Sequence, residues 1–446
     1  MRISLVAIGC RLNSGEIDAL ARDFSAAGHC VVPSGADADL VVMNTCTVTH
    51  RAAADSRQLI RRLRREHARA ALVVTGCYAQ LSAHTARALG ADLVVGNQYK
   101  DVLPEILHEA GLLASPEPLP TQGSVVEAAA GRTRAFLKVQ DGCDNRCTFC
   151  VVTQARGRAR SRPLSSVVTD VNRLVALGYR EVVLCGVHLG AYGHDRGSVD
   201  GLEKLVEALL RETDISRLRL SSLEPWDLQH GFFRLWENER LQPHLHLPMQ
   251  SGCDTTLRRM GRRNTCASFR ELLQAARSAI PDLAVSTDIM VGFPGESDTE
   301  FQQSLEFAES MNFTSMHIFR YSIRTGTPAA GMPKQVNVSV AKHRSQRLHT
   351  LGAHMQAKFM ERFVGRKLDV LWERAHAHGD GFRWSGLTPN YLRVVTHTDH
   401  VINLHNSVTD TSLVAVVEDG LLGEVIARVE PVSQVATVEH MRESAA

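Results

Sequence analysis

The stretch DGCDNRCTFC, residues 141–150, decides how the rest of this chain is interpreted. It contains Cys143, Cys147 and Cys150, and it follows an apolar run, residues 136–139, that predicts a buried β-strand. The three thiols are therefore expected on one loop at the carboxyl end of that strand. Three such thiolates can each bind one iron of a 4Fe-4S cube and leave the fourth iron open to a ligand. A zinc site without its fourth ligand, or three buried thiols, is the alternative interpretation.

The strand before this loop is the first of six similar units. Apolar runs alternate with amphipathic helices, for example residues 166–177 and 269–278. Repeated strand-then-helix units predict parallel strands that curve into a barrel or part of one, with the working face at the carboxyl ends of the strands. The predicted strands of this central core, residues 130–363, are 136–139, 181–184, 218–220, 244–247, 284–291 and 315–319.

The upstream residues, 1–120, alternate short apolar runs with helix-like stretches such as 56–67, which predicts an open, parallel α/β domain. A passage rich in Pro, Gly and Ala, residues 113–131, predicts a linker to the central core. The predicted strands of this domain are 3–8, 40–43, 72–75 and 93–95.

Cys10, Cys46 and Cys77 share one feature, because each comes at the end of a predicted strand. The ends of parallel strands emerge at one edge of a sheet, where the ligand sites of open α/β folds lie. We therefore expect these thiols to meet there and to hold a second iron–sulfur cluster with an open iron. The alternative is three unrelated core cysteines. The remaining cysteines are interpreted as buried or incidental thiols, namely Cys30, Cys185, Cys253 and Cys266.

The last part of the chain, residues 364–434, lacks helical periodicity. Short alternating runs at 368–372, 391–395 and 413–417 predict a small all-β barrel or sandwich. Residues 366–434 contain 6 Lys plus Arg against 9 Asp plus Glu, so this part is not expected to bind polyanions by charge alone.

The composition excludes several classes of protein. Of the 446 residues, 44% are hydrophobic and 22% charged, which fits several globular domains rather than a disordered or disulfide-stabilised chain. The apolar start, residues 3–8, turns polar too early for a secretory signal, and no apolar stretch is long enough to cross a bilayer. We therefore expect a cytoplasmic protein without membrane contact, in which the 10 cysteines are kept reduced.

The net charge of the chain does not favour binding to polyanions, because 50 Lys plus Arg nearly cancel 48 Asp plus Glu. Any such binding must come from local clusters of basic residues. One cluster consists of Arg156, Arg158, Arg160 and Arg162, at alternate positions just after the cysteine loop. We expect these side chains to contact phosphates of a nucleic acid near the chemistry. The arginines within 57–69 and 258–263 are more simply explained as solvated faces.

A second loop, DIMVGFPGE at residues 288–296, ends a predicted strand and opens a helix. Its glycines allow a ligand to approach the backbone closely. Together with the cysteine loop upstream, this loop is expected to hold an adenosyl group.

The spacing C-x3-C-x2-C, with an aromatic residue before the last cysteine, is similar to the signature of the radical S-adenosylmethionine enzymes. Over nearly its whole length the chain resembles one family of these enzymes, the methylthiotransferases. That family has an amino-terminal cluster domain, a partial (β/α)6 barrel and a carboxyl-terminal TRAM domain of OB-like fold. The matching motifs, in order, are GCRLN (9–13), NTC (44–46), TGCYAQ (75–80), the loop 143–150, LHLPMQSG (245–252) and GFPGE (292–296).

The resemblance implies two 4Fe-4S clusters and two S-adenosylmethionine molecules. One molecule methylates a sulfur species at the cluster of Cys10, Cys46 and Cys77, and the other gives a deoxyadenosyl radical at the second cluster. The radical removes the hydrogen of carbon 2 of an adenine in tRNA, and sulfur couples there. Acid and base residues alone would fail, because this C–H has no acidic proton and no leaving group. The implied cofactor contacts are Gly186, Ser251, Asp288, Gly292, Pro294, Gly295 and Glu296.

Other motifs resemble the branch of the family that modifies N(6)-threonylcarbamoyladenosine next to the tRNA anticodon. They are SRQ (56–58), ARG (155–157) with RSR (160–162), and GVHLGAYG (186–193). Two departures from the family pattern are Asn264, where an aromatic residue is usual, and Cys185, where Thr is usual. An electron donor protein and a sulfur donor are further implied partners, and the chain is expected to act as a monomer.

Other functions are kept open. The same chemistry could act on isopentenyladenosine in tRNA or on a side chain of a ribosomal protein. A rival of another class is a noncatalytic iron–sulfur protein that binds RNA and senses iron or oxygen.

Overall fold

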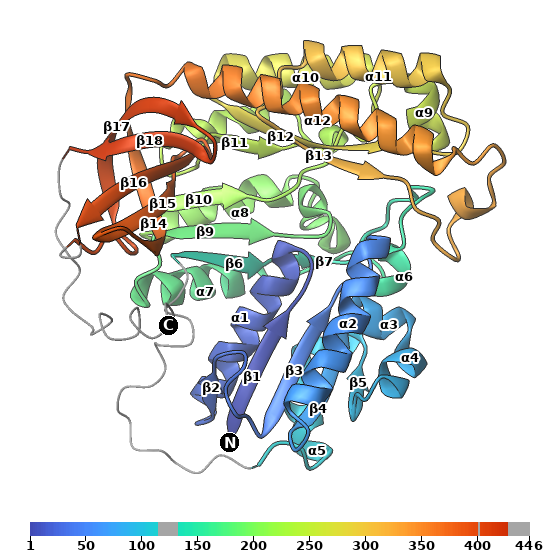
Figure 1. Ribbon diagram of the computed structural model, residues 1–446, viewed down its shortest axis with the longest axis vertical. Helices are drawn as coiled ribbons and strands as arrows, with labels where there is room; N and C mark the ends of the chain where they lie inside the picture. The colour runs from blue at the N-terminus through green and yellow to red at the C-terminus, as the bar shows by residue number, and fades with distance from the viewer. Residues whose placement is uncertain (115–132, 400–401, 427–446) are drawn as a thin grey trace.

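The computed structural model describes residues 1–114, 133–399 and 402–426, which form three parts coloured from blue to red in Figure 1. Most of the predicted linker, residues 113–131, and the end of the predicted last domain, residues 427–434, lie outside the described residues. No helix within the described ranges has the length and apolar character needed to cross a membrane.

The amino-terminal part is a parallel sheet in the order β2-β1-β3-β4-β5. Val41 and Met43 of β3 pack under α2, whereas Leu40 and Val42 pack on α1 and α5, so both faces of the sheet are covered. The predicted open parallel α/β domain is thereby confirmed. The strands are β1 (Arg2–Ala7), β2 (Cys30–Val32), β3 (Leu40–Thr45), β4 (Ala71–Gly76) and β5 (Leu93–Val95), and the helices are α1 (Arg11–Ala26), α2 (His50–Glu66), α3 (Cys77–Leu81), α4 (Ala83–Ala88) and α5 (Leu103–Glu109).

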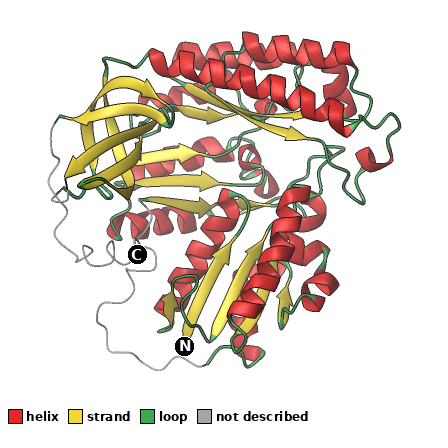
Figure 2. Cartoon of the chain, viewed as in Figure 1, coloured by secondary structure: helices red, strands yellow, loops and turns green. Residues whose placement is uncertain are grey.

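The central part is a partial barrel of parallel strands with helices on its outer side (Figure 2). Its two sheets, β10-β9-β6 and β11-β12-β13, are connected by single bridges such as Leu218 to Leu241 and Ser222 to His246. The predicted six strands are all present: β6 (Arg134–Lys138), β9 (Glu181–Cys185), β10 (Arg217–Leu220), β11 (His244–His246), β12 (Ala284–Val291) and β13 (Ser315–Arg320). The main outer helices are α7 (Leu164–Ala176), α8 (Gly201–Glu212), α10 (Cys266–Ala279), α11 (Asp298–Ser310) and α12 (Val338–Glu361).

Short elements complete the central part around the cysteine loop. They are β7 (Gln140–Asp141), α6 (Val152–Arg156), β8 (Arg160–Ser161) and α9 (Asp254–Arg259). Alternate residues of the barrel strands face opposite ways. Val182 and Leu184 of β9 belong to the core under the helices, whereas Val183 and Cys185 pack with Leu12 of the amino-terminal part.

The carboxyl-terminal part is a closed barrel in the order β14-β15-β16-β18-β17, which selects the barrel over the sandwich. Trp372 and Trp384 fill its core, and the indole N–H of Trp372 donates to Thr409 Oγ1 at 2.8 Å. Its strands are β14 (Lys367–His378), β15 (Gly381–Leu387), β16 (Arg393–Asp399), β17 (Val408–Val417) and β18 (Gly420–Val425).

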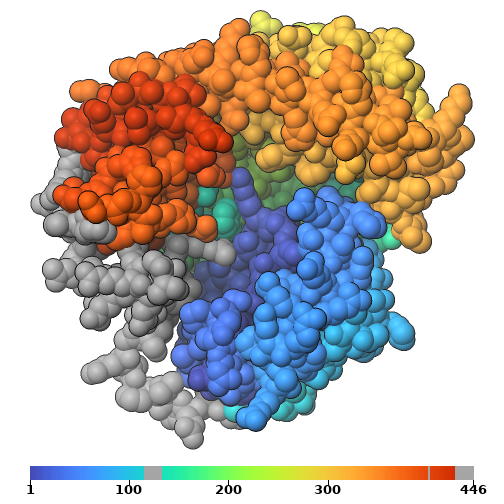
Figure 3. Space-filling view, viewed as in Figure 1, coloured from blue at the N-terminus to red at the C-terminus, as the bar shows by residue number. Residues whose placement is uncertain are grey.

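The amino-terminal part docks on the central part through α1, which lies against β6. The space-filling view shows a recess where the blue amino-terminal part meets the central part and the orange-red barrel (Figure 3). Close approach of α1 to β6 depends on Gly15, because a Cβ there would lie 2.5 Å from the carbonyl oxygen of Phe136.

We predict that Gly15→Ala destabilises the protein by about 1–3 kcal/mol, because the new methyl group overpacks against strand backbone that cannot move aside. An ordinary Gly→Ala change inside a helix stabilises instead, by about 0.5–1 kcal/mol. Chemical unfolding of the two proteins measures the difference. Gly231→Ala is the matched control, since a Cβ at Gly231 meets nothing within 4 Å. Equal stability of the Gly15 and Gly231 variants would contradict the close packing.

Candidate active site

The loop of Cys143, Cys147 and Cys150 follows β6 and β7, at the carboxyl edge of the barrel strands. It closes back on the end of α6, because the Cys143 N–H donates to Gly157 O at 3.1 Å. Gly142 makes this closure possible: its φ is 70°, and a Cβ there would lie 1.9 Å from Arg158 O. Backbone N–H groups point at the sulfurs, from Asn145 to Cys143 Sγ at 3.4 Å and from Val152 to Cys150 Sγ at 3.5 Å.

Cationic groups surround this loop. The Arg262 guanidinium lies 3.8 Å from Cys147 Sγ and pairs with Glu224 at 2.6 Å. Burial alone would lower the pKa of His188, but hydrogen bonds to Asp227 and Cys143 raise it to about 10. His188 is therefore an imidazolium at neutral pH. Positive groups beside Cys143 and Cys147 are suited to offset the negative charge of thiolates.

Two thiols of the loop, those of Cys147 and Cys150, are made weaker acids by burial. Burial raises the pKa of Cys150 to about 12, and it also raises the pKa of Cys147 against the effect of Arg262. Metal binding must then release protons from these thiols, which couples assembly of the site to pH.

The second group of thiols, Cys10, Cys46 and Cys77, is brought together by neighbouring strands. Cys46 directly follows β3 and Cys77 directly follows β4, and the register Thr45 to Gly76 sets these two ends level. Cys10 comes three residues after the end of β1, in a loop where a Cβ on Gly9 would lie 2.7 Å from Cys46 Sγ. Burial, and then the neighbouring Cys10 and Cys77, raise the pKa of Cys46 to about 11. Cys10 and Cys77 thus lie near enough to Cys46 to affect its pKa, and a cluster held by the three thiols stays a prediction.

The two cysteine groups face each other across the contact of α3 with α6. The Asn97 amide donates to Cys77 Sγ at 3.7 Å and to Ala155 O at 2.6 Å, so one side chain joins both loops. The Arg156 guanidinium also lies close enough for Cys77 to raise its pKa, although burial opposes the shift.

A buried ionic network holds this contact. Glu16 of α1 is 4% exposed, and its carboxylate accepts hydrogen bonds from Lys100 at 2.7 Å and Arg156 at 3.0 Å. Arg156 also donates to Asp141 at 2.9 Å, and Lys138 lies 3.5 Å from Glu16. Burial alone would raise the pKa of Glu16, but Lys100, Arg156 and Lys138 hold it well below its usual value.

The polar residues beside the cysteines complete this network. Asn13 accepts from Arg156 at 2.7 Å and donates to Thr45 O at 3.0 Å, next to Cys46. The Asn44 amide donates to Glu16 at 2.9 Å. Through Asn13 and Asn44 the network reaches the ends of the strands that precede the auxiliary cysteines, and through Asp141 it reaches the loop of Cys143.

The predicted phosphate contacts are partly wrong. Arg156 is 5% exposed and engaged by Glu16 and Asp141, so it is not available to a nucleic acid. The alternating series of arginines did not indicate that Arg156 is buried, because its partner Glu16 is distant in the sequence. Arg162 pairs with Asp170 at 2.7 Å and is partly exposed. Arg158 and Arg160 are exposed and stay candidates for phosphate contact.

The loop 292–296 lies beside the cysteine loop. Phe149 and Phe293 meet edge to face with ring centroids 6.4 Å apart. Glu296 is 5% exposed, and its carboxylate accepts from the Gly292 N–H at 2.7 Å and from Arg344 at 2.6 Å. Its predicted direct contact with a cofactor is therefore corrected, because the side chain shapes the loop from within.

The other predicted cofactor contacts lie on several strand ends or in the loops that follow them. Gly186 follows β9, and Ser251 comes after β11, where its hydroxyl accepts from the Cys253 N–H at 3.3 Å. Pro294 and Gly295 lie in the loop after β12. These residues stay predictions as cofactor contacts. Of the departures from the family pattern, Cys185 is buried near Cys10, and Asn264 is buried with no partner for its amide among the described residues.

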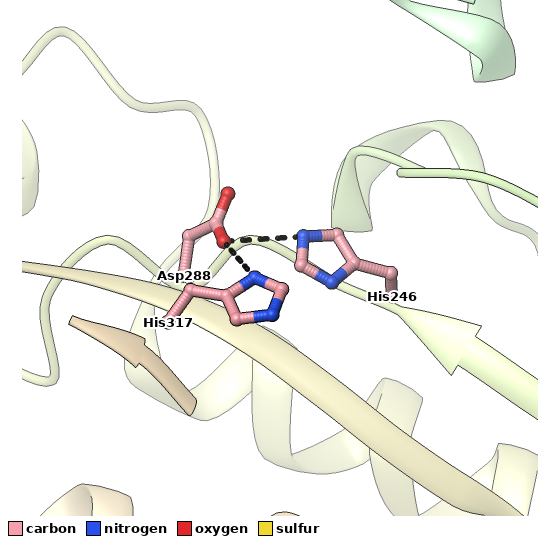
Figure 4. A group of neighbouring side chains, drawn as sticks. All are labelled: His246, Asp288 and His317. Atoms are coloured by element: carbon pink, nitrogen blue, oxygen red, sulfur yellow. Dashed lines mark hydrogen bonds and ion pairs between the residues drawn. The ribbon is translucent and has the colours of Figure 1, made fainter. Parts of the chain in front are cut away.

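Asp288 stands between two histidines, as Figure 4 shows. Its Oδ1 lies 3.3 Å from His246 Nε2 and 3.1 Å from His317 Nδ1. Burial would raise the pKa of Asp288, but the two imidazoles hold it well below its usual value. Ser286 Oγ lies 2.9 Å from His246 Nδ1 and orients that ring. The result is an ionised carboxylate that can accept hydrogen bonds from hydroxyl groups of a bound molecule.

The spacing of possible metal ligands bears on the alternative that the cysteines bind zinc. Within the described ranges, His246, Asp288 and His317 form the one group of ligand types whose donor atoms all lie within 4.8 Å of one another. The cysteine trios are thus not spaced as ligands of a single ion, whereas a 4Fe-4S cube takes each thiolate on a separate iron. All 10 cysteines are free thiols, so both trios are available as ligands.

Several site residues escaped the sequence analysis. Glu16 and Lys100 are charged residues of ordinary helical segments, and no local pattern marks their burial. A signal did exist for Glu16, because it follows Leu12 and precedes Leu20 on the apolar face of α1. His188 lies within a quoted motif, but its role depends on Asp227, 39 residues away.

We predict that Glu16→Gln costs about 3–5 kcal/mol at neutral pH, because it leaves buried Lys100 without its carboxylate partner and leaves Arg156 with Asp141 alone. The folded-state pKa of Glu16 is lowered, so its contribution is present above the usual value of 4.5 and is lost as the pH falls through the folded pKa. Urea unfolding of the cluster-free protein at pH 7 and at a series of pH values below 4.5 measures both effects, because the contribution of Glu16 is lost only in that lower range. The variant should lose less stability on acidification than the wild type, and an equal loss would contradict the network.

Comparisons with known proteins show what this chain is similar to. The family model described as "Uncharacterized protein family UPF0004" matches residues 2–96, and the model of the radical SAM superfamily matches residues 137–308. The chain is 35% identical to the threonylcarbamoyladenosine tRNA methylthiotransferase MtaB of Bacillus subtilis, over 87% of this chain and 88% of the relative. It is 38% identical to the tRNA-2-methylthio-N(6)-dimethylallyladenosine synthase of Novosphingobium aromaticivorans, over 85% of this chain and 88% of the relative.

A further relative is the MtaB protein of Thermotoga maritima, at 37% identity over 83% of this chain and 86% of the relative. Among solved structures, the radical S-adenosylmethionine methyltransferase TsrM of Kitasatospora setae superposes with a TM-score of 0.56. That match covers 74% of this chain and 77% of TsrM at 15% sequence identity, and it shows a shared fold.

Proposed function

Because this chain belongs to the radical S-adenosylmethionine tRNA methylthiotransferases, we propose that it methylthiolates carbon 2 of N(6)-threonylcarbamoyladenosine next to the anticodon. The observation that supports the chemistry most directly is the pair of cysteine trios joined through Asn97 and Arg156. Sulfur donation and radical formation must occur at one adenine, so the two sites have to open on a common space.

The choice of nucleoside is supported by motifs rather than by overall identity. A relative named for threonylcarbamoyladenosine is 35% identical to this chain and one named for dimethylallyladenosine is 38% identical, so overall identity does not separate the two substrates. The motifs typical of the threonylcarbamoyladenosine branch lie around the two trios. Ser56 Oγ donates to Cys46 O at 2.8 Å, Arg156 belongs to the Glu16 network, and His188 lies beside Cys143.

The residues of the chain would hold the cofactors as follows. Cys143, Cys147 and Cys150 would ligate the cluster that binds S-adenosylmethionine, and Cys10, Cys46 and Cys77 the auxiliary cluster. Bound there, the two clusters and S-adenosylmethionine would supply the radical and the methylthio group that acid and base residues cannot provide. Arg262 and His188 would offset thiolate charge, and Gly292 and Gly295, whose φ values are 74° and 77°, would form the turn that holds an adenosyl group.

Other side chains position the cofactor and tRNA. Asp288 is held ionised by its histidines, so it would accept hydrogen bonds from ribose hydroxyls. Leu12, which follows Cys10 by two residues, packs with buried Val183 and Cys185 and so ties the start of α1 to β9. Arg158 and Arg160, which follow the cysteine loop and are exposed, would contact tRNA phosphates.

The proposed function is tested by nucleoside mass spectrometry after anaerobic incubation with S-adenosylmethionine, a reductant and tRNA that carries either nucleoside. We expect methylthiolation of threonylcarbamoyladenosine and little of isopentenyladenosine. Methylthiolation of isopentenyladenosine alone would overturn the proposed substrate. A noncatalytic RNA-binding sensor would instead bind tRNA without releasing 5′-deoxyadenosine.

We predict that Cys46→Ala and Cys147→Ala each remove about half of the bound iron, because each breaks one cluster and spares the other. Anaerobic iron and sulfide quantification of the purified variants checks this. Cys253→Ala is the control, since Cys253 is buried outside both trios and should leave the iron content unchanged. Complete loss of iron in either trio variant would contradict two separate clusters.

We also predict that the double change Arg158→Ala and Arg160→Ala weakens tRNA binding and lowers the slope of log K against log salt by about 2, one for each phosphate contact. Filter binding at several salt concentrations measures the slope. Arg211→Ala is the control, because Arg211 is exposed on α8 on the outer side of the barrel. An unchanged slope would show that these arginines do not contact phosphate.

A further inference from the structure

Tyr391 has an unusual backbone conformation in the turn between β15 and β16. Its φ is 68°, a value that bulky residues rarely adopt. The turn is rigid, because the Tyr391 N–H donates to Thr388 O at 3.0 Å and the Leu392 N–H donates to Thr388 Oγ1 at 2.9 Å. Asn390 anchors the turn to the central part through Asp282 O at 3.3 Å. A strained residue that its surroundings enforce suggests a specific role for the side chain.

The Tyr391 side chain reaches all three parts of the molecule. Its ring lies 4.6 Å from the ring of His244 and 4.6 Å from the Arg219 guanidinium, both of the central part. Its hydroxyl accepts from Arg134 at 3.0 Å and from Arg11 of the amino-terminal part at 2.6 Å. Two acceptor bonds use both lone pairs of a hydroxyl group.

The surroundings of Tyr391 are fixed independently of its hydroxyl. Arg219 forms a bidentate pair with Glu181 at 2.9 and 3.0 Å, both residues fully buried, and it also donates to Pro389 O at 3.0 Å. Arg134 also donates to Glu373 of β14 at 2.6 Å. The small barrel therefore stays docked on the central part even without the Tyr391 hydroxyl, which separates docking from the contact with Arg11.

Arg11 matters because it directly follows Cys10. Cys46 and Cys77 are buried at strand ends, where the sheet holds them, but Cys10 is exposed and precedes the first turn of α1. The Cys10 thiol has a weak contact with Asn13 at 3.8 Å, and its side chain makes no capping bond with the helix. Of the three thiols, Cys10 has the least local support, so its place depends most on its neighbour Arg11.

We propose that Tyr391 is a positioning residue for the auxiliary site: its hydroxyl holds Arg11, and Arg11 fixes Cys10 beside Cys46 and Cys77. The carboxyl-terminal barrel thus has a direct connection to a cysteine of the sulfur-donating site. A tRNA that shifts this barrel would act on Cys10 through one side chain. The role of Tyr391 in sulfur transfer rests on the proposed function. The contact from Tyr391 through Arg11 to Cys10 does not, and it can be measured directly.

Hydrogen exchange of the full-length protein tests the connection. Tyr391→Phe removes the hydroxyl and keeps the ring that packs on Arg219 and His244. Loss of a charge-assisted hydrogen bond should speed exchange of the amides in residues 8–14 by about tenfold in the cluster-free chain. Glu373→Gln is the matched control, because it weakens the docking contact of Arg134 without touching Arg11. Unchanged exchange in Tyr391→Phe, or an equal increase in the control, would overturn the proposal.

Arg11→Gln provides a second variant that removes the same bond from the other side. It should also speed exchange of residues 8–14, and the double variant should speed exchange by less than the two single changes combined, as expected for partners in one interaction. Additive effects would show that the two residues act separately.

The auxiliary site itself is observed by electron paramagnetic resonance after reconstitution, and one-electron reduction with dithionite, of protein in which Cys143, Cys147 and Cys150 are changed to Ala. We expect Tyr391→Phe to alter the spectrum of the remaining cluster, whereas Glu373→Gln leaves it unchanged. In the otherwise wild-type enzyme, Tyr391→Phe should raise the ratio of 5′-deoxyadenosine released to methylthiolated nucleoside formed. An unaltered spectrum together with an unaltered ratio would refute positioning of the auxiliary cluster.

These measurements separate the two claims. If wild-type protein forms no methylthiolated nucleoside, the proposed function fails, while the exchange experiment still decides whether Tyr391 holds the Cys10 segment.

Discussion

The arrangement of this molecule depends on one buried carboxylate. Glu16 is enclosed by Lys100 of its own domain and by Arg156 and Lys138 of the central part. A charge removed from water is tolerated only where partners compensate it fully, and a missing partner is costly. Because the partners come from two domains, the carboxylate is satisfied only when the domains sit in one relative position. That position also brings the thiols of the amino-terminal sheet next to the loop of Cys143.

The two ends of the central barrel have different roles: one carries the predicted cofactor loops and the other contacts the small barrel. The carboxyl edge carries the cysteine loop, Gly186 and the loop after β12, as expected for strands of this type. At the other end, buried Arg219 and Glu181 pair with each other and Arg219 contacts the small barrel at Pro389. The superposition on TsrM covers 74% of this chain at 15% identity, so the shared fold extends beyond the barrel itself.

Much of this could be predicted from the sequence, because the signals are local. Long apolar runs such as Leu40–Thr45 predict strands whatever their surroundings, and closely spaced cysteines predict a metal loop by themselves. The short edge strand Cys30–Val32 was missed, since three residues show no periodicity. Arg156 was misinterpreted because an alternating arginine series looks like a phosphate-binding strip, and its partner Glu16 lies 140 residues away. Contacts between domains have no signal in a single sequence, and most of the polar residues of the site are of that kind.

The same sequence separation has a consequence for how the protein is made. Lys100 becomes available soon after the first sheet is complete, but Lys138 and Arg156 leave the ribosome later than the whole amino-terminal domain. Until then the face of α1 that carries Leu12, Gly15 and Glu16 has neither its strand nor its full set of counter-charges. The first domain therefore waits in an incomplete state during synthesis, and Cys10, Cys46 and Cys77 acquire their final surroundings only once the central part has begun to fold.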